Sequence, residues 1–178
     1  MGLLPPFVGA VIFCALQFTV FLFVLVSTPI DQLKFKGSDA CWTFFGAKIK
    51  CSNAKRSATG IEAFGCAHRR NNMNGGAAFA IFSICTTLAA LVFGILMLLR
   101  IPCAVLIPLI LTCLSVLTIL ISWACVAGVY SERMCSTSTS NGVKASAFMD
   151  YGAGFGLMVT AWCLQIINVV VLVLVSFF

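Results

Sequence analysis

The sequence predicts an all-α membrane protein in which the whole chain, residues 1–178, forms one bundle of four transmembrane helices. Hydrophobic residues make up 61% of the chain and charged residues only 9%. The mean hydropathy of +1.10 is too high for a water-soluble domain to cover with polar side chains. In addition, four apolar stretches are each long enough to cross a hydrocarbon layer of about 30 Å.

The four apolar stretches cover residues 7–26, 77–99, 104–130 and 152–176. Each is expected to be a helix, because lipid cannot satisfy backbone hydrogen bonds and the runs lack the alternation of a β-barrel. The first run is longer than the core of a cleavable signal peptide, so we expect it to be retained. The last contains the polar residues Gln165 and Asn168, which favour a true span over a lipid-anchor signal. Four crossings place both termini on one side.

The connections between the spans are very unequal in length. Residues 27–76 and 131–151 form two long loops on one side of the membrane, whereas only a short turn around Arg100 joins the second and third spans. No Asp, Glu, Lys, Arg or His lies inside any predicted span, which argues against a pump or a proton-coupled transporter. The polar span residues Gln17, Gln165 and Asn168 are expected to form hydrogen bonds between helices.

Four of the ten cysteines lie in the two long loops, at Cys41, Cys51, Cys66 and Cys135. An even number of loop cysteines is typical of an oxidising compartment, and four cysteines allow three pairings. We favour a disulfide between Cys41 and Cys51, which closes a short loop and would stabilise it by about 3 kcal/mol in the chain-entropy model. Cys66 and Cys135 would form the second pair.

The remaining cysteines lie in or beside the spans, and we also consider whether any cysteine could bind a metal. Cysteines inside the spans are interpreted as small buried hydrophobic residues. Cys103, beside Arg100 at the membrane edge, is a candidate palmitoylation site. A zinc site at Cys51, Cys66 and His68 would lack the two short paired spacings of such sites. We therefore expect neither a metal nor a cofactor.

The first long loop is basic, with eight cationic residues against three acidic ones, a net charge of +5. Such a patch can attract anionic lipid headgroups or acidic glycans, or it can simply keep the loop solvated. No nucleic-acid-binding fold is recognisable, so nucleic acid is not an expected partner. The candidate contact residues are Lys34, Lys36, Lys48, Lys50, Lys55, Arg56, Arg69 and Arg70.

The charges and the cysteines disagree about orientation. The positive-inside rule would hold the basic first loop in the cytoplasm. A disulfide-closed hairpin would serve no purpose there, because the cytoplasm keeps thiols reduced. We follow the cysteines and predict a plasma-membrane protein with both long loops outside and both termini in the cytoplasm.

The segment from Cys41 to Cys51 resembles the signature of the amastins, small four-span surface proteins of kinetoplastid parasites. Trp42 and Lys50 depart from the family's usual residues at their positions. The span count and the loop lengths agree with the family as well. The matching residues are Cys41, Thr43, Phe44, Phe45, Gly46, Lys48 and Cys51.

The resemblance implies a claudin-like architecture, with a left-handed helix bundle and a small antiparallel β-sheet in the outer loops, closed by a disulfide. Residues 41–45 and 48–51 would be the arms of a hairpin that turns at Gly46-Ala47, since glycine suits a tight turn. The bulky residues Trp42, Phe44 and Phe45 either pack onto the helix ends, which we favour, or form an exposed apolar rim. The third span, the longest, would project beyond the lipid.

No arrangement of nucleophile, base and acid indicates an enzyme. The resemblance implies a structural or adhesive surface protein that contacts a host membrane, a lipid, a glycan or further copies of itself as a homo-oligomer. The alternative is an oligomeric pore or transport accessory protein for ions or small solutes. No Asn-x-Ser/Thr acceptor occurs in the chain, so N-glycosylation is not expected.

Overall fold

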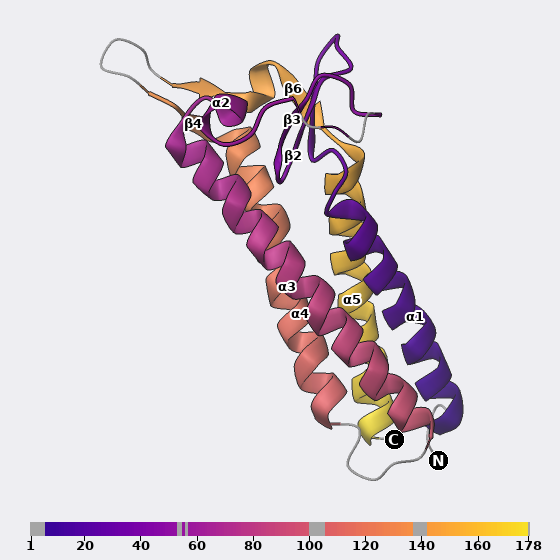
Figure 1. The fold of residues 1–178 in the computed structure, drawn as a ribbon. Helices are drawn as coiled ribbons and strands as arrows, with labels where there is room; N and C mark the ends of the chain where they lie inside the picture. Colours follow the sequence, from indigo (N-terminus) through magenta and orange to yellow (C-terminus); the bar gives the residue numbers. More distant parts are fainter. Residues whose placement is uncertain (1–5, 53–54, 56, 100–105, 137–141, 178) are drawn as a thin grey trace.

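Four long helices dominate the computed structural model, which describes residues 6–52, 55, 57–99, 106–136 and 142–177 (Figure 1). The four helices are α1 (Pro6–Ser27), α3 (Ala67–Leu98), α4 (Leu106–Ser131) and α5 (Ala153–Phe177). All four are long and apolar enough to cross a membrane, which confirms the predicted four-span bundle. The start of α1 and the end of α5 lie at the same end of the bundle (Figure 1).

The second membrane helix differs from its predicted extent, because α3 begins at Ala67 rather than at residue 77. Its 32 residues correspond to a length of about 48 Å, well over the thickness of the hydrocarbon layer. The prediction that the third span is the longest is therefore wrong. Apart from Met73, residues 68–74 are polar and a search for apolar spans assigns them to a loop, but they continue α3 above the level at which α1 ends (Figure 1).

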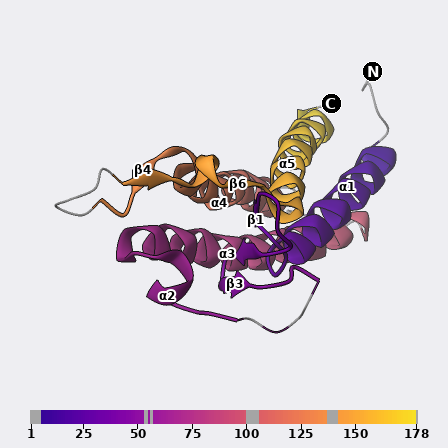
Figure 2. The same cartoon turned by 90° about the horizontal axis from the view of Figure 1, so that it is seen from above.

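The helices pack as two pairs, α3 with α4 and α1 with α5 (Figure 2). The buried positions of α1 and α5 alternate at spacings of three and four residues, the repeat of helices that cross at small angles. On α1 these positions are Ala10, Phe13, Gln17, Val20 and Val24, and on α5 they are Met158, Ala161, Gln165, Asn168 and Leu172.

Polar side chains connect the helices near the middle of the bundle. Asn168 Nδ2 donates a 2.7 Å hydrogen bond to Gln17 Oε1, and Gln17 Nε2 donates to the carbonyl oxygen of Thr87 at 3.2 Å. These bonds join α5 to α1 and α1 to α3, as predicted for Gln17 and Asn168. Gln165 is also fully buried, but its amide has no hydrogen-bond partner within the described part of the chain.

Both outer loops contribute to one antiparallel sheet at the end of the bundle opposite the start of α1 (Figure 1). Its strand order is β3-β2-β1-β6, so a strand of the second loop pairs with the first strand of the first loop. The sheet strands are β1 (Leu33–Phe35), β2 (Cys41–Thr43), β3 (Gly46–Lys48) and β6 (Met149–Tyr151). Around them lie α2 (Ile61–Phe64), a hairpin of β4 (Arg133–Met134) and β5 (Val143–Lys144), and the short helix η1 (Ala145–Ala147). The predicted fold class is confirmed.

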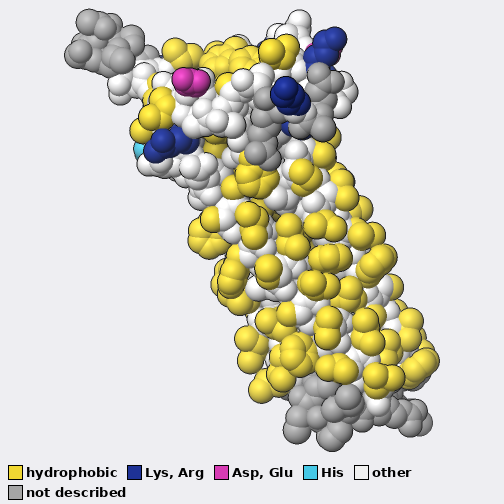
Figure 3. Space-filling model, viewed as in Figure 1, with side chains coloured by type: hydrophobic (Ala, Val, Ile, Leu, Met, Phe, Trp, Pro, Cys, Tyr) yellow, Lys and Arg dark blue, Asp and Glu magenta, His cyan; other side chains and the backbone are white. Residues whose placement is uncertain are grey.

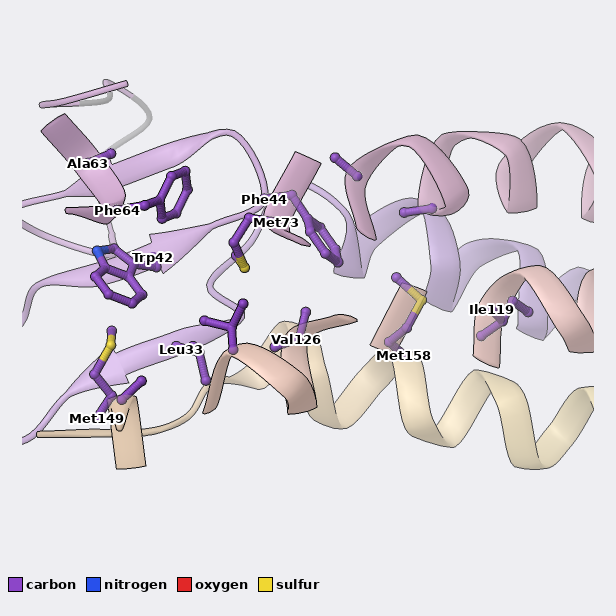
Figure 4. Close-up of a cluster of buried hydrophobic side chains, with 14 of the residues drawn as sticks. Leu33, Trp42, Phe44, Ala63, Phe64, Met73, Ile119, Val126, Met149 and Met158 are labelled. Carbon is purple, nitrogen blue, oxygen red and sulfur yellow. The ribbon is translucent and has the colours of Figure 1, made fainter. Parts of the chain in front are cut away.

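The two faces of the sheet have opposite character. Leu33, Trp42 and Met149 are buried on the face toward the helices, where Phe64 of α2 joins them (Figure 4). Charged side chains gather at this end of the molecule, while hydrophobic side chains cover the length of the helices (Figure 3). The bundle thus presents an apolar surface to lipid and the sheet presents a polar surface to water.

Candidate functional site: the braced outer module

Two disulfides brace the outer module, by which we mean the described parts of residues 28–66 and 132–152. They join Cys41 to Cys51 and Cys66 to Cys135, with Cα–Cα distances of 5.6 and 5.5 Å, and both predicted pairs are confirmed. The first closes the hairpin, and the second ties the start of α3 to the chain after β4. Because Cys51 and Cys66 are bonded to other cysteines, neither is a free thiolate for the zinc site considered with His68.

The hairpin turns at Phe44-Phe45, so the predicted turn at Gly46-Ala47 is wrong. Thr43 pairs with Gly46, and its Oγ1 accepts the N–H of Phe45 at 3.2 Å and donates to the carbonyl oxygen of Gly46 at 3.0 Å. Gly46 has φ of +145°, and a Cβ atom there would collide with the carbonyl oxygen of Ala58. The signature glycine is required because β3 passes Ala58 so closely, and not because it forms the turn.

Two of the signature's bulky residues fasten the hairpin to the helices. Trp42 is 4% exposed and Phe44 is fully buried, which confirms that they pack onto the helix ends. The ring of Phe44 lies against Gly76 of α3, and the ring of Trp42 meets that of Phe64 edge-on at 5.7 Å. Phe45 is half-buried. The signature therefore describes a folding unit more than an exposed binding surface.

Arg69 belongs to this core and not to the exposed basic set in which the sequence placed it. Its side chain is 6% exposed. Nη1 donates to the carbonyl oxygen of Phe64 and Nη2 to that of Val143, both at 3.2 Å. The guanidinium also lies 5.2 Å from the ring centroid of Trp42. Arg69 thus connects α2, the β4–β5 hairpin and the sheet, and it is not available to an anionic surface.

Exposed cations of the first loop lie on the side of the sheet away from the helices. Across the sheet Lys34 stands opposite Cys41, which stands opposite Lys48, so these side chains share the face away from the bundle. Lys36 lies two residues beyond Lys34 on that face. We define the outer cationic face as Lys34, Lys36 and Lys48 together with the exposed lysines that follow β3, Lys50 and Lys55.

The other predicted site residues lie elsewhere. Arg70 is half-buried on α3, where its Nη2 donates to Asn71 Oδ1 at 3.3 Å. Arg56 and the candidate palmitoylation site Cys103 lie outside the described residues. Two further exposed cations, Arg133 and Lys144, stand opposite each other on β4 and β5, and no sequence pattern indicated them as site residues.

A pocket of about 500 Å³ opens at the edge of the outer cationic face, and we call it the edge pocket. It joins the turn between β1 and β2 to strand β6, which the sequence separates by more than a hundred residues. No pattern in either loop indicated this pairing. The pocket is lined by Lys34, Phe35, Lys36, Gly37, Ser38, Asp39, Asp150 and Tyr151.

Comparison with protein families gives a match over most of the chain. A family model described as "Amastin surface glycoprotein" matches residues 18–172, from the middle of α1 to near the end of α5. The match includes the whole outer module and both disulfides. No curated protein matches the chain.

Proposed function

The chain belongs to the amastin surface glycoprotein family, and from this we propose that it is a non-enzymatic adhesion protein of the plasma membrane that binds acidic glycans on an opposing host surface. The binding surface is the outer cationic face. The termini are cytoplasmic, and the bundle serves as the anchor that holds the outer module at the cell surface.

The observation that carries this proposal is the separation of charge across the sheet. The apolar side chains Leu33, Trp42 and Met149 face the helices, whereas Lys34 and Lys48 stand on the opposite face of the sheet. Clustered lysines raise the local concentration of a polyanion and increase its association rate. A face turned away from the protein's own bundle is suited to a partner that approaches from outside.

The two disulfides support the outward orientation, since such bonds persist in oxidising compartments and are rare in the cytoplasm. The family is described as one of surface glycoproteins, which agrees with a non-catalytic role. A pore between subunits would need polar side chains on the lipid-facing helix surface, but the three amide side chains Gln17, Gln165 and Asn168 are all buried. We therefore do not favour the pore.

Binding is tested with the full chain in nanodiscs of neutral lipid, presented to immobilised heparin, to polysialic acid and to neutral dextran. We expect both acidic glycans to bind and dextran not to bind. Affinity should fall steeply with salt, because the screening length shortens from about 10 Å at 0.1 M to about 3 Å at 1 M. The proposal would be refuted if the protein bound neither acidic glycan at low salt. If it then bound vesicles of anionic lipid, the partner of the outer cationic face would be a membrane and not a glycan.

Two double variants locate the surface. Lys50→Gln with Lys55→Gln removes two charges from the outer cationic face, and Arg133→Gln with Lys144→Gln removes two from the β4–β5 hairpin. We expect the first pair to weaken heparin binding by about tenfold and the second by about twofold at most. Equal losses would show that only net charge matters.

A further inference from the structure

The edge pocket has a fixed shape because its turn is held on both sides. The N–H of Lys36 donates to the carbonyl oxygen of Phe148 at 3.0 Å, and the N–H of Cys51 donates to that of Asp39 at 2.8 Å. Gly37 supplies the positive φ of 73° that the turn requires. The Cys41–Cys51 disulfide therefore fixes the position of Asp39 as well as the hairpin.

The charges in the edge pocket are only partly paired. Lys36 Nζ lies 3.6 Å from Asp150 Oδ1 and donates to the carbonyl oxygen of Ser146 at 2.9 Å. Within the described part of the chain, Lys34 and the carboxylate of Asp39 take part in no ion pair. One cation and one carboxylate thus remain to meet a ligand in a pocket of a size typical of small-molecule sites.

We propose that the edge pocket binds a single acidic sugar residue, its anionic group on Lys34 and its hydroxyl groups on the carboxylates of Asp39 and Asp150. This inference rests on the proposed glycan binding and names the residues that select the sugar. The lysines of the outer cationic face attract the acidic glycan, and the edge pocket binds one sugar residue of that glycan.

The carboxylates are the reason for choosing a sugar over a simple anion. A phosphate or sulfate ion would be repelled by Asp39 and Asp150, since ionised carboxylates only accept hydrogen bonds. A hydroxyl group can donate to a carboxylate in a charge-assisted bond, and sugars carry several hydroxyls beside their anionic group. Ser38 adds a hydroxyl that can still donate, because its Oγ accepts the N–H of Ala40 at 3.1 Å.

The test measures binding of the full chain in neutral nanodiscs to polysialic acid and to dextran sulfate, using three single variants. Asp39→Asn raises the net charge by one, so attraction by charge alone predicts tighter binding, whereas the pocket predicts weaker binding. Lys34→Gln removes a pocket cation. Lys55→Gln is its matched control, with the same loss of charge at an exposed position outside the pocket.

We expect Asp39→Asn and Lys34→Gln each to weaken polysialic acid binding by about tenfold, the effect of losing one charged hydrogen bond, and Lys55→Gln by about twofold. The proposed sugar site would be refuted if Asp39→Asn bound polysialic acid as tightly as the unaltered protein or more tightly, and if the two lysine variants lost affinity equally. The proposed function would not be affected by that result. If the unaltered protein binds neither polymer, the proposed function fails and the pocket with it. Circular dichroism of each variant confirms the fold.

Discussion

Replacing Arg69 with methionine is expected to destabilise the protein by about 3 kcal/mol, because one buried and one partly buried carbonyl oxygen lose their charged donor. Those oxygens belong to Phe64 and Val143, and each accepts a 3.2 Å bond from the Arg69 guanidinium. Methionine keeps much of the apolar volume, so the loss reports mainly on the hydrogen bonds and on the contact with Trp42. Thermal unfolding in detergent measures the stability, and hydrogen exchange should show the β4–β5 hairpin loosening first.

The neighbouring arginine supplies the control. Arg70 is half-buried, and its Nη2 donates a hydrogen bond to the adjacent side chain of Asn71. Arg70→Met removes the same charge one residue away, and we expect its free energy of unfolding to stay within about 0.5 kcal/mol of the unaltered protein. If both variants were equally stable, Arg69 would not be the connection between the module and the bundle.

Gly76→Ala is expected to destabilise the protein by about 2 kcal/mol through overpacking. A Cβ atom on Gly76 would lie 2.7 Å from Cε1 of Phe44 and 3.2 Å from the carbonyl oxygen of Ser122. The ring of Phe44 is fully buried and has no room to move aside. The signature hairpin would therefore be pushed off the ends of α3 and α4, which thermal unfolding in detergent would detect.

Gly75→Ala is the matched control, on the same helix and one residue earlier. Its Cβ would have its nearest neighbour, Cys125 Sγ, at an ordinary 3.9 Å. Alanine favours a helix over glycine by about 0.5–1 kcal/mol, so this variant should be slightly more stable than the unaltered protein. If Gly76→Ala and Gly75→Ala both stabilised the protein, the ring of Phe44 would not pack against Gly76.

Much of the membrane part could be predicted from the sequence, because apolar length alone decides whether a helix spans lipid. The cysteine pairs also followed, since four loop cysteines leave few pairings and the closest two close a short loop. The start of α3 could not be predicted in this way, because its first turn carries His68, Arg69 and Arg70, which a search for apolar spans excludes. Nothing local distinguishes a helical polar segment there from a loop.

The site was harder to predict than the fold, because its residues meet only through tertiary structure. From the sequence, Arg69 cannot be distinguished from the exposed cations of the loop. Only the fold brings the carbonyl oxygens of Phe64 and Val143 to its guanidinium. Strands β1 and β6 have three residues each, too few to show alternation. The pairing of Lys34 with Asp150 across these strands therefore could not be predicted from either loop. The position of Gly46 was misread because its role depends on Ala58, which a local turn rule does not consider.

The central claim is that a disulfide-braced module lies outside the cell. It is tested most directly by labelling Cys41 and Cys51 on intact cells with a membrane-impermeant maleimide, before and after mild reduction, with permeabilised cells for comparison and peptide mapping to identify the labelled residues. We expect both cysteines to be labelled on intact cells only after reduction. Labelling that needs permeabilisation and no reduction would place a reduced module in the cytoplasm, and would contradict both the orientation and the adhesion function.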